Sequence, residues 1–159
     1  MMDAIAMKNV VLAYAAALGS ILANALGGWD SCMKLLVTLM AADYITGVLL
    51  AAVWHKSAKS ETGALSSTAG FRGLCKKGVI LLVVWVAAQL DRAIGAAYIR
   101  TAVVLFFSGN EGLSLLENLG QMGVPYPEVM KRALEALEEK GDSGKEQNDE
   151  SETVYSDKE

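Results

Sequence analysis

Histidine, cysteine and proline are scarce in this 159-residue sequence, which contains one histidine, two cysteines and two prolines. His55 alone cannot form a metal-ligand cluster, and Cys32 and Cys75 indicate neither a disulfide framework nor a metal site. The glycines are scattered and lack the spacing of a phosphate-binding loop. No motif pairs a nucleophile with a base. We therefore expect a protein that is not an enzyme and that uses no metal and no cofactor.

Acidic residues are concentrated at one end of the chain. Residues 141–159 hold seven acids and two lysines, so they carry more negative charge than the net −4 of the whole sequence. This segment is polar and poor in apolar residues, which predicts a disordered acidic tail. Elsewhere no basic face with interleaved aromatic residues is evident, so the sequence gives no indication of nucleic-acid binding.

Long apolar runs are abundant, and 53% of the residues are hydrophobic. Residues 35–54 read LLVTLMAADYITGVLLAAVW and contain a single charged side chain, Asp43. As an α-helix this run would be about 30 Å long, the thickness of the hydrocarbon core of a bilayer. We predict a membrane-spanning helix here. Because a charge at the centre of a bilayer costs at least about 2.5 kcal/mol, Asp43 is a candidate functional residue.

A second apolar run covers residues 10–29, and small residues recur in it every four positions. Small residues at this spacing lie on one helix face and let two membrane helices approach closely. The expected packing residues are Ala15, Gly19, Ala23, Gly27 and, in the span at 35–54, Gly47. An alternative is a signal peptide cleaved after Ala23-Asn24-Ala25. We favour an uncleaved span because the apolar run continues past that site.

The segment 55–77 is the most basic loop of the chain. The residues expected to determine the topology are Lys56, Lys59, Arg72, Lys76 and Lys77. By the positive-inside rule this loop is cytoplasmic, and the N-terminus then lies on the same side. Ser66-Ser67-Thr68 could cap a helix that begins near Ala69 and runs into the next span.

Two further spans are expected, and each has an alternative. The apolar run 78–90 is too short to span alone; we favour a tilted helix over 78–99, the alternative being a helix that stops at Asp91. Residues 101–119 have a polar stripe and either span or lie flat at the interface. We favour spanning.

The expected fold is therefore all-α: an integral membrane protein with three to four transmembrane helices, four being favoured. The spans are 10–29, 35–54, 78–99 and 101–119, followed by a short amphipathic helix at 128–140 and the disordered tail at 141–159. The residues 1–140 form the membrane domain.

Polar residues within these spans are the candidate site. They are Asp43, Asp91, Asn110, Glu111 and Glu117. A carboxyl group in hydrocarbon is protonated, paired with a cation such as Arg92 or Arg100, or exposed to a water-filled lumen. These residues line a pore if the helices of several copies assemble with their polar faces inward, or pair within a packed bundle if the helices associate within one chain, and the sequence alone fits both.

Several segments resemble the phage holins of the toxin-secretion and phage-lysis group over roughly residues 35–140. The matching segments are Asp43-Tyr44-Ile45-Thr46-Gly47, Ser66-Ser67 with Gly70-Phe71-Arg72-Gly73-Leu74-Cys75-Lys76-Lys77, Leu90-Asp91, Asn110-Glu111-Gly112-Leu113-Ser114-Leu115-Leu116-Glu117-Asn118 and Gly123-Val124-Pro125-Tyr126-Pro127. The resemblance implies a multi-span protein of the bacterial inner membrane that assembles with itself into lesions in the bilayer. These lesions let a cell-wall hydrolase, an endolysin, leave the cytoplasm, and no direct contact between the holin and the endolysin is required.

Two other functions fit the same residues. A small ion or proton transporter, or a channel subunit, could use the carboxyl groups as a relay, although no inverted repeat or broken helix pair is evident. A membrane anchor could instead recruit a partner through its acidic tail.

Overall fold

The computed structural model describes residues 4–55 and 66–142, and this part of the chain is entirely helical. Lys56, Lys59 and the tail from residue 143 lie outside the described residues. The elements are α1 (Ala4–Ala25), α2 (Ser31–Leu49), a π-helical turn η1 (Leu50–Trp54) that continues α2, α3 (Ser67–Ile94), α4 (Ile99–Met122) and α5 (Glu128–Asp142). The all-α prediction is confirmed.

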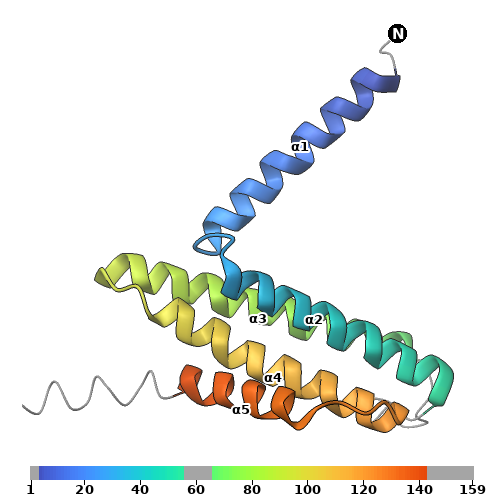
Figure 1. Ribbon diagram of the computed structural model, residues 1–159. Helices are drawn as coiled ribbons and strands as arrows, with labels where there is room; N and C mark the ends of the chain where they lie inside the picture. Colours follow the sequence, from blue (N-terminus) through green and yellow to red (C-terminus); the bar gives the residue numbers. More distant parts are fainter. Residues whose placement is uncertain (1–3, 56–65, 143–159) are drawn as a thin grey trace, which may run out of the picture.

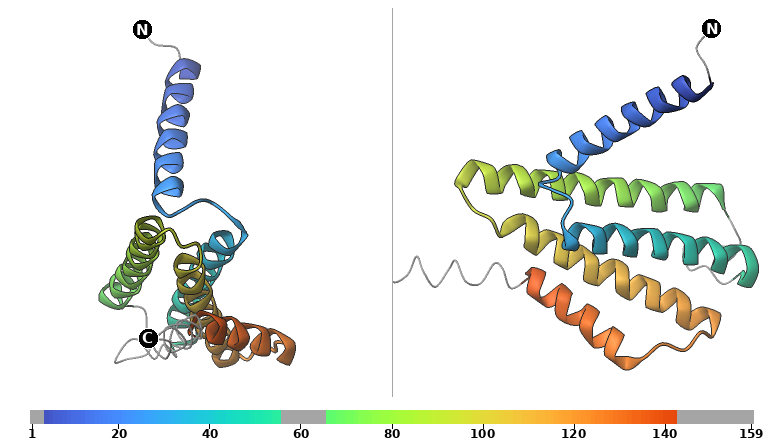
Figure 2. Two further views of the ribbon diagram at one scale, coloured as in Figure 1. Left: turned by 90° about the vertical axis from the view of Figure 1, so that its left-hand side faces the viewer. Right: turned by 45° about the horizontal axis from the view of Figure 1, so that its top comes forward.

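Helices α2, α3 and α4 lie side by side as a bundle, and α5 packs against α4 (Figure 1). Helix α1 projects away from this bundle, as both views in Figure 2 show. Its residues from Ile5 to Leu22 are all exposed. The chain therefore has a packed part, α2 to α5, and one helix without lateral contacts to it.

Three helices are long and apolar enough to cross a membrane. They are Ile5–Ala25, Ser31–Trp54 and Ser67–Ile94. They contain the expected spans 35–54 and most of those at 10–29 and 78–99. The fourth expected span, 101–119, falls within α4, which is not among the three.

The junction between α3 and α4 differs from the favoured prediction of a helix over 78–99. Helix α3 ends at Ile94 because Gly95 adopts a left-handed conformation with φ of 70°, which glycine does without steric cost. The Asp91 carboxylate then accepts hydrogen bonds from the backbone N–H groups of Ile99 and Arg100, both at 3.0 Å. Asp91 thereby satisfies donors that the first turn of α4 leaves unpaired.

At its other end α3 begins at Ser67, and the Ser66 hydroxyl accepts a hydrogen bond from the Ala69 N–H at 3.4 Å. The predicted serine cap is confirmed. Likewise, Asp30 caps α2 by accepting from the Met33 N–H at 2.8 Å, so this helix begins four residues before the expected span.

The small residues expected to form one face of the first span do not all lie on a helix. Ala15 and Gly19 are exposed on α1, and Ala23 is partly buried near its end. Gly27 lies beyond the helix, in a turn with φ of +83°, so its assignment to the helix face is wrong. A side chain there would also collide with Arg100, whose Cδ would be 2.6 Å from the added Cβ.

The apolar core lies between α2, α3 and α4. Its buried residues are Met33, Leu36 and Met40 of α2, Ile80 and Val84 of α3, and Val104 of α4. Outside this core α2 and α3 expose many large apolar side chains, whereas the exposed residues of α4 are only Glu117, Gly120 and Gln121. Helix α4 is therefore enclosed by its neighbours.

Helices α4 and α5 approach closely because two glycines of α4 face α5. A Cβ atom added at Gly109 would lie 2.7 Å from the Leu134 carbonyl oxygen and from the Glu138 Cβ, and one at Gly112 would collide with the Leu134 side chain. Leu134 is the buried residue of α5. Backbone and side-chain atoms of α5 thus occupy the space that larger residues would need.

We expect Gly109→Val to loosen α5 from α4, because overpacking a close contact costs about 1–3 kcal/mol. The measurement is the rate of tryptic cleavage at Lys131 and Arg132 in detergent-solubilised protein, which should rise. Gly120→Val is the matched control, since the nearest atom to its added Cβ is 3.9 Å away. Equal cleavage rates for both variants would contradict the observed packing.

Candidate functional site

A buried lysine joins two carboxylates at the centre of the bundle. The Lys77 ammonium group of α3 donates to the Asp43 Oδ2 of α2 at 2.8 Å and to the Glu111 Oε2 of α4. The Glu111 side chain is 1% exposed, and Asp43 and Lys77 are also buried. We refer to Asp43, Lys77 and Glu111 as the ion cluster. It connects all three bundle helices through charge.

Asn118 extends the ion cluster along α4. Its Nδ2 donates to the Asp43 Oδ1 at 3.0 Å and to the Thr46 hydroxyl at 3.1 Å. Gly47 leaves room for this amide, because a Cβ at Gly47 would lie 3.6 Å from the Asn118 Nδ2. Gly47 thus lies at the contact between α2 and α4. Asn118 was part of the expected polar stripe but not of the predicted site.

The charges of the ion cluster do not balance by themselves. When all three groups are ionised, two carboxylates face one ammonium. Lys76 supplies a second cation, with its Nζ 3.7 Å from the Glu111 Oε1, but its side chain is 61% exposed. Glu111 Oε1 has no hydrogen-bond partner among the described residues. Because an unpaired buried charge is costly, Lys77 is the residue on which the cluster depends.

A second polar centre ties the end of α1 to the start of α4. The Arg100 guanidinium donates to the carbonyl oxygens of Leu26 at 2.5 Å and Gly28 at 2.9 Å, and to the Asp30 Oδ2 at 2.6 Å. Arg92 adds a bond to the Asn24 carbonyl oxygen at 2.6 Å. We call these contacts the Arg100 junction. The hydrogen bond from Arg100 lowers the pKa of Asp30, which lies outside the helices able to span.

The predicted site residues separate into three groups. Asp43 and Glu111 meet in the ion cluster, while Asp91 lies at the turn between α3 and α4. Asn110 is partly buried and Glu117 is exposed on α4, and neither contacts the ion cluster in an observed hydrogen bond. Among the expected topology residues, Arg72 and Lys76 are exposed.

The sequence reasoning missed that Lys77 is the partner of the carboxylates, and it named Arg92 and Arg100 instead. A signal was present in the spacing. The buried residues of α2 and α3 recur at intervals of three and four, giving Met33, Leu36, Met40 and Asp43 in one helix and Lys77, Ile80, Val84 and Ala87 in the other. Such spacing marks one helix face. Lys77 therefore belongs to the core face of α3.

The chemistry that the arrangement offers is electrostatic pairing between buried charges. In the described residues no group of three or more histidine, cysteine, aspartate or glutamate side chains is placed to hold a metal ion. Both cysteines are free thiols. The site can hold helices together, or expose charge if they separate.

Comparisons with known proteins converge on one family. A family model described as the bacteriophage holin family matches residues 20–139. An uncharacterized protein of Clostridium perfringens strain 13 is 41% identical over 125 residues, covering 77% of this chain and 87% of its own length. A protein of Bacillus phage phi105 named a probable holin is 35% identical over 118 residues, with 74% and 82% covered. No solved structure matches the chain significantly.

We expect Lys77→Met to destabilise the bundle by about 3–5 kcal/mol, because it leaves two buried carboxylates without their cation. Thermal unfolding in detergent, followed by circular dichroism, measures this loss. The neutral triple variant Asp43→Asn, Lys77→Met, Glu111→Gln should lose less, and Lys76→Met should lose less than about 1 kcal/mol. If the triple variant is as unstable as Lys77→Met, charge pairing is not the reason for the loss.

The Arg100 junction should weaken in acid. Since Arg100 lowers the pKa of Asp30 from its ordinary 3.8, the stabilisation from this pair is complete above about pH 4 and is lost as the pH falls below that value. The carboxyl carbon chemical shift of Asp30 in detergent should titrate with a midpoint below 3.8. Arg100→Gln should raise this midpoint, and a wild-type midpoint at or above 3.8 would refute the pairing.

Proposed function

Because the chain belongs to the bacteriophage holin family, we propose that it is a holin that oligomerises in the bacterial cytoplasmic membrane and permeabilises it. A cell-wall hydrolase would leave through the resulting holes during phage lysis or protein secretion. Direct contact with that enzyme is not required, because any soluble protein can pass through an opening of sufficient size. The proposal accords with three helices long enough to span a membrane.

The ion cluster is the observation that supports this proposal most directly. A lysine and two carboxylates are enclosed where three helices meet, and the outer surfaces of α2 and α3 are apolar. Helices α2, α3 and α4 can therefore enter hydrocarbon without exposing the ion cluster to lipid. Copies inserted in this way can then associate.

The proposed topology has four crossings. The positively charged segment 55–77 and the N-terminus would face the cytoplasm, and the four-residue link between α3 and α4 would face outward. Helix α4 would cross despite its polar residues because α2 and α3 pack beside it and its charged Glu111 is paired. Enclosed polar residues of this kind are tolerated at membrane depth when they face protein.

Helix α1 is the proposed association element. It is apolar, its side chains from Ile5 to Leu22 are exposed, and the small residues Ala15 and Gly19 lie on its surface. In hydrocarbon, helices associate through close packing of small residues. An apolar helix held to the bundle only at its end is free to pack against another copy.

Lys77→Met should delay or abolish lysis in a bacterial host that co-expresses an endolysin, because the bundle loses its central pairing. Asp43→Leu should delay lysis less, since Lys77 keeps Glu111 as a partner. The measurements are the time of growth arrest and the release of the hydrolase. Lys76→Met should lyse at the wild-type time.

Membrane fractions must contain equal amounts of each protein, so that insertion is separated from permeabilisation. If Lys77→Met arrests growth at the same time as the wild type when equal amounts of both proteins are in the membrane, the ion cluster plays no part in permeabilisation. Sustained growth without hydrolase release in the wild type would exclude the holin function. A non-lethal ion current would then favour the transporter, and loss of all function on deleting residues 143–159 would favour the anchor.

A further inference from the structure

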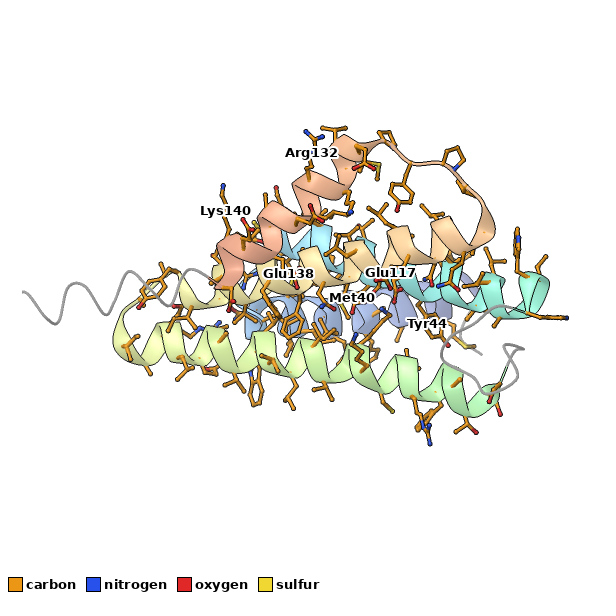
Figure 3. The ribbon with its side chains drawn as sticks, turned by 90° about the horizontal axis from the view of Figure 1, so that it is seen from below. Met40, Tyr44, Glu117, Arg132, Glu138 and Lys140 are labelled. Atoms are coloured by element: carbon orange, nitrogen blue, oxygen red, sulfur yellow. The ribbon has the colours of Figure 1, made fainter. Side chains whose placement is uncertain are left out.

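Helix α5 is the most highly charged helix of the described chain, and nearly all of its charged side chains are exposed. The charged residues are Glu128, Lys131, Arg132, Glu135, Glu138, Glu139, Lys140 and Asp142, and only Glu138 is partly buried. In Figure 3 the labelled Arg132 and Lys140 point away from the other helices. The five acids and three bases give α5 a net charge of −2.

Helix α5 runs back along α4 instead of extending away from the bundle. The two helices run in opposite directions: Leu134 of α5 lies beside Gly112 of α4, and Glu138, one turn later, lies beside Gly109. The last turn of α5 lies beside the first two turns of α4, where Gly141 lies against Phe106 and the Ala102 carbonyl. Fifteen helical residues cover about 22 Å, so α5 covers most of α4.

The bundle therefore has two chemically opposite sides. One side is formed by α2 and α3, which expose large apolar residues such as Ile45, Val79 and Leu82. The opposite side is α5 with its exposed charges, and α4 lies between the two, as Figure 2 shows. If α4 crosses the membrane beside α2 and α3, then α5 lies at the same depth.

Hydrocarbon cannot cover the charged side of α5. A charge at the bilayer centre is costly, and α5 carries several exposed ones. Both side chains of the ion pair between Lys131 and Glu135 are exposed, so this pair offsets little of the cost of burying charge in the membrane. At membrane depth this face must meet water.

We propose that α5 forms the water-facing wall of the holin hole, with α4 behind it and α2 and α3 against lipid. This inference rests on the proposed function. It assigns the lumen to Arg132, Glu135, Glu139 and Lys140, while Asp43 and Glu111 remain paired inside the wall. The net negative charge of α5 then gives the hole a preference for cations at low salt.

A reducible cross-link tests whether α5 stays on α4 while the hole is open. In a background with Cys32→Ser and Cys75→Ser, the pair Phe106→Cys and Glu138→Cys is bridged by a short bis-methanethiosulfonate reagent. The two positions are neighbours, because Gly141, one turn after Glu138, lies against Phe106, and Glu138 lies against Gly109, one turn after Phe106. Vesicles of phosphatidylethanolamine and phosphatidylglycerol with a trapped dye report release. The linked and reduced proteins should release dye at rates within about twofold.

Charge reversal tests whether α5 faces the lumen. Glu135→Lys with Glu139→Lys changes the net charge of α5 from −2 to +2. In planar bilayers at about 10 mM salt, where the screening length is about 30 Å, the reversal potential should change from cation-preferring to anion-preferring. Lys8→Glu with Lys34→Glu, an equally large change on α1 and α2, should leave it unaltered.

The outcomes separate the two proposals. If wild-type protein releases no dye, the proposed holin function fails. If the reduced variant releases dye and the linked one retains it, α5 leaves α4 before opening and the wall assignment is wrong. An unchanged reversal potential after charge reversal on α5 also overturns it. If the cysteine pair disables the reduced protein as well, the charge-reversal measurement alone decides.

Discussion

The fold depends on one lysine held between two carboxylates. Lys77 lies on α3, Asp43 on α2 and Glu111 on α4, so no two of these helices can separate without unpairing a charge. In water such a pairing contributes little, because solvent replaces the lost partner. In a low-dielectric interior the partner is hard to replace, and breaking the pair costs several kcal/mol. The apolar surfaces of the three helices would by themselves permit several arrangements. The ion cluster therefore selects one of them.

The Arg100 junction has a different role because it lies at the end of the helices. Arg100 bonds to two backbone carbonyls and Asp30, and these bonds fix the chain between α1 and α2 without holding α1 against the bundle. The chain is thus divided into a packed bundle and a helix that projects away from it (Figure 2). The proposed self-association would use both parts, since one keeps each copy folded and the other is exposed to a neighbouring copy.

Much of the fold could be predicted from the sequence, because span length and hydropathy are properties of each segment alone. The predictions failed where the outcome depended on two segments. The turn at Gly95 brings the Asp91 carboxylate to the first N–H groups of α4, and the turn at Gly27 places that residue against the Arg100 side chain. Lys77 was assigned to the basic loop since it directly precedes an apolar run. Its position on the core face of α3 emerges only when the spacing of several residues is read together.

The close packing of α5 could not have been predicted from its own sequence. Its charge pattern is that of a helix at a water interface, and Gly109 and Gly112 within α4 resemble small residues found in any membrane helix. Only their contact shows that α4 is enclosed on one side by apolar helices and on the other by a charged one. A bundle with one apolar and one charged side is not stable alone at the centre of a bilayer. Under the proposed holin function, several copies would satisfy both sides at once by turning their charged faces toward a common aqueous space, and a ring is the arrangement that we propose for them.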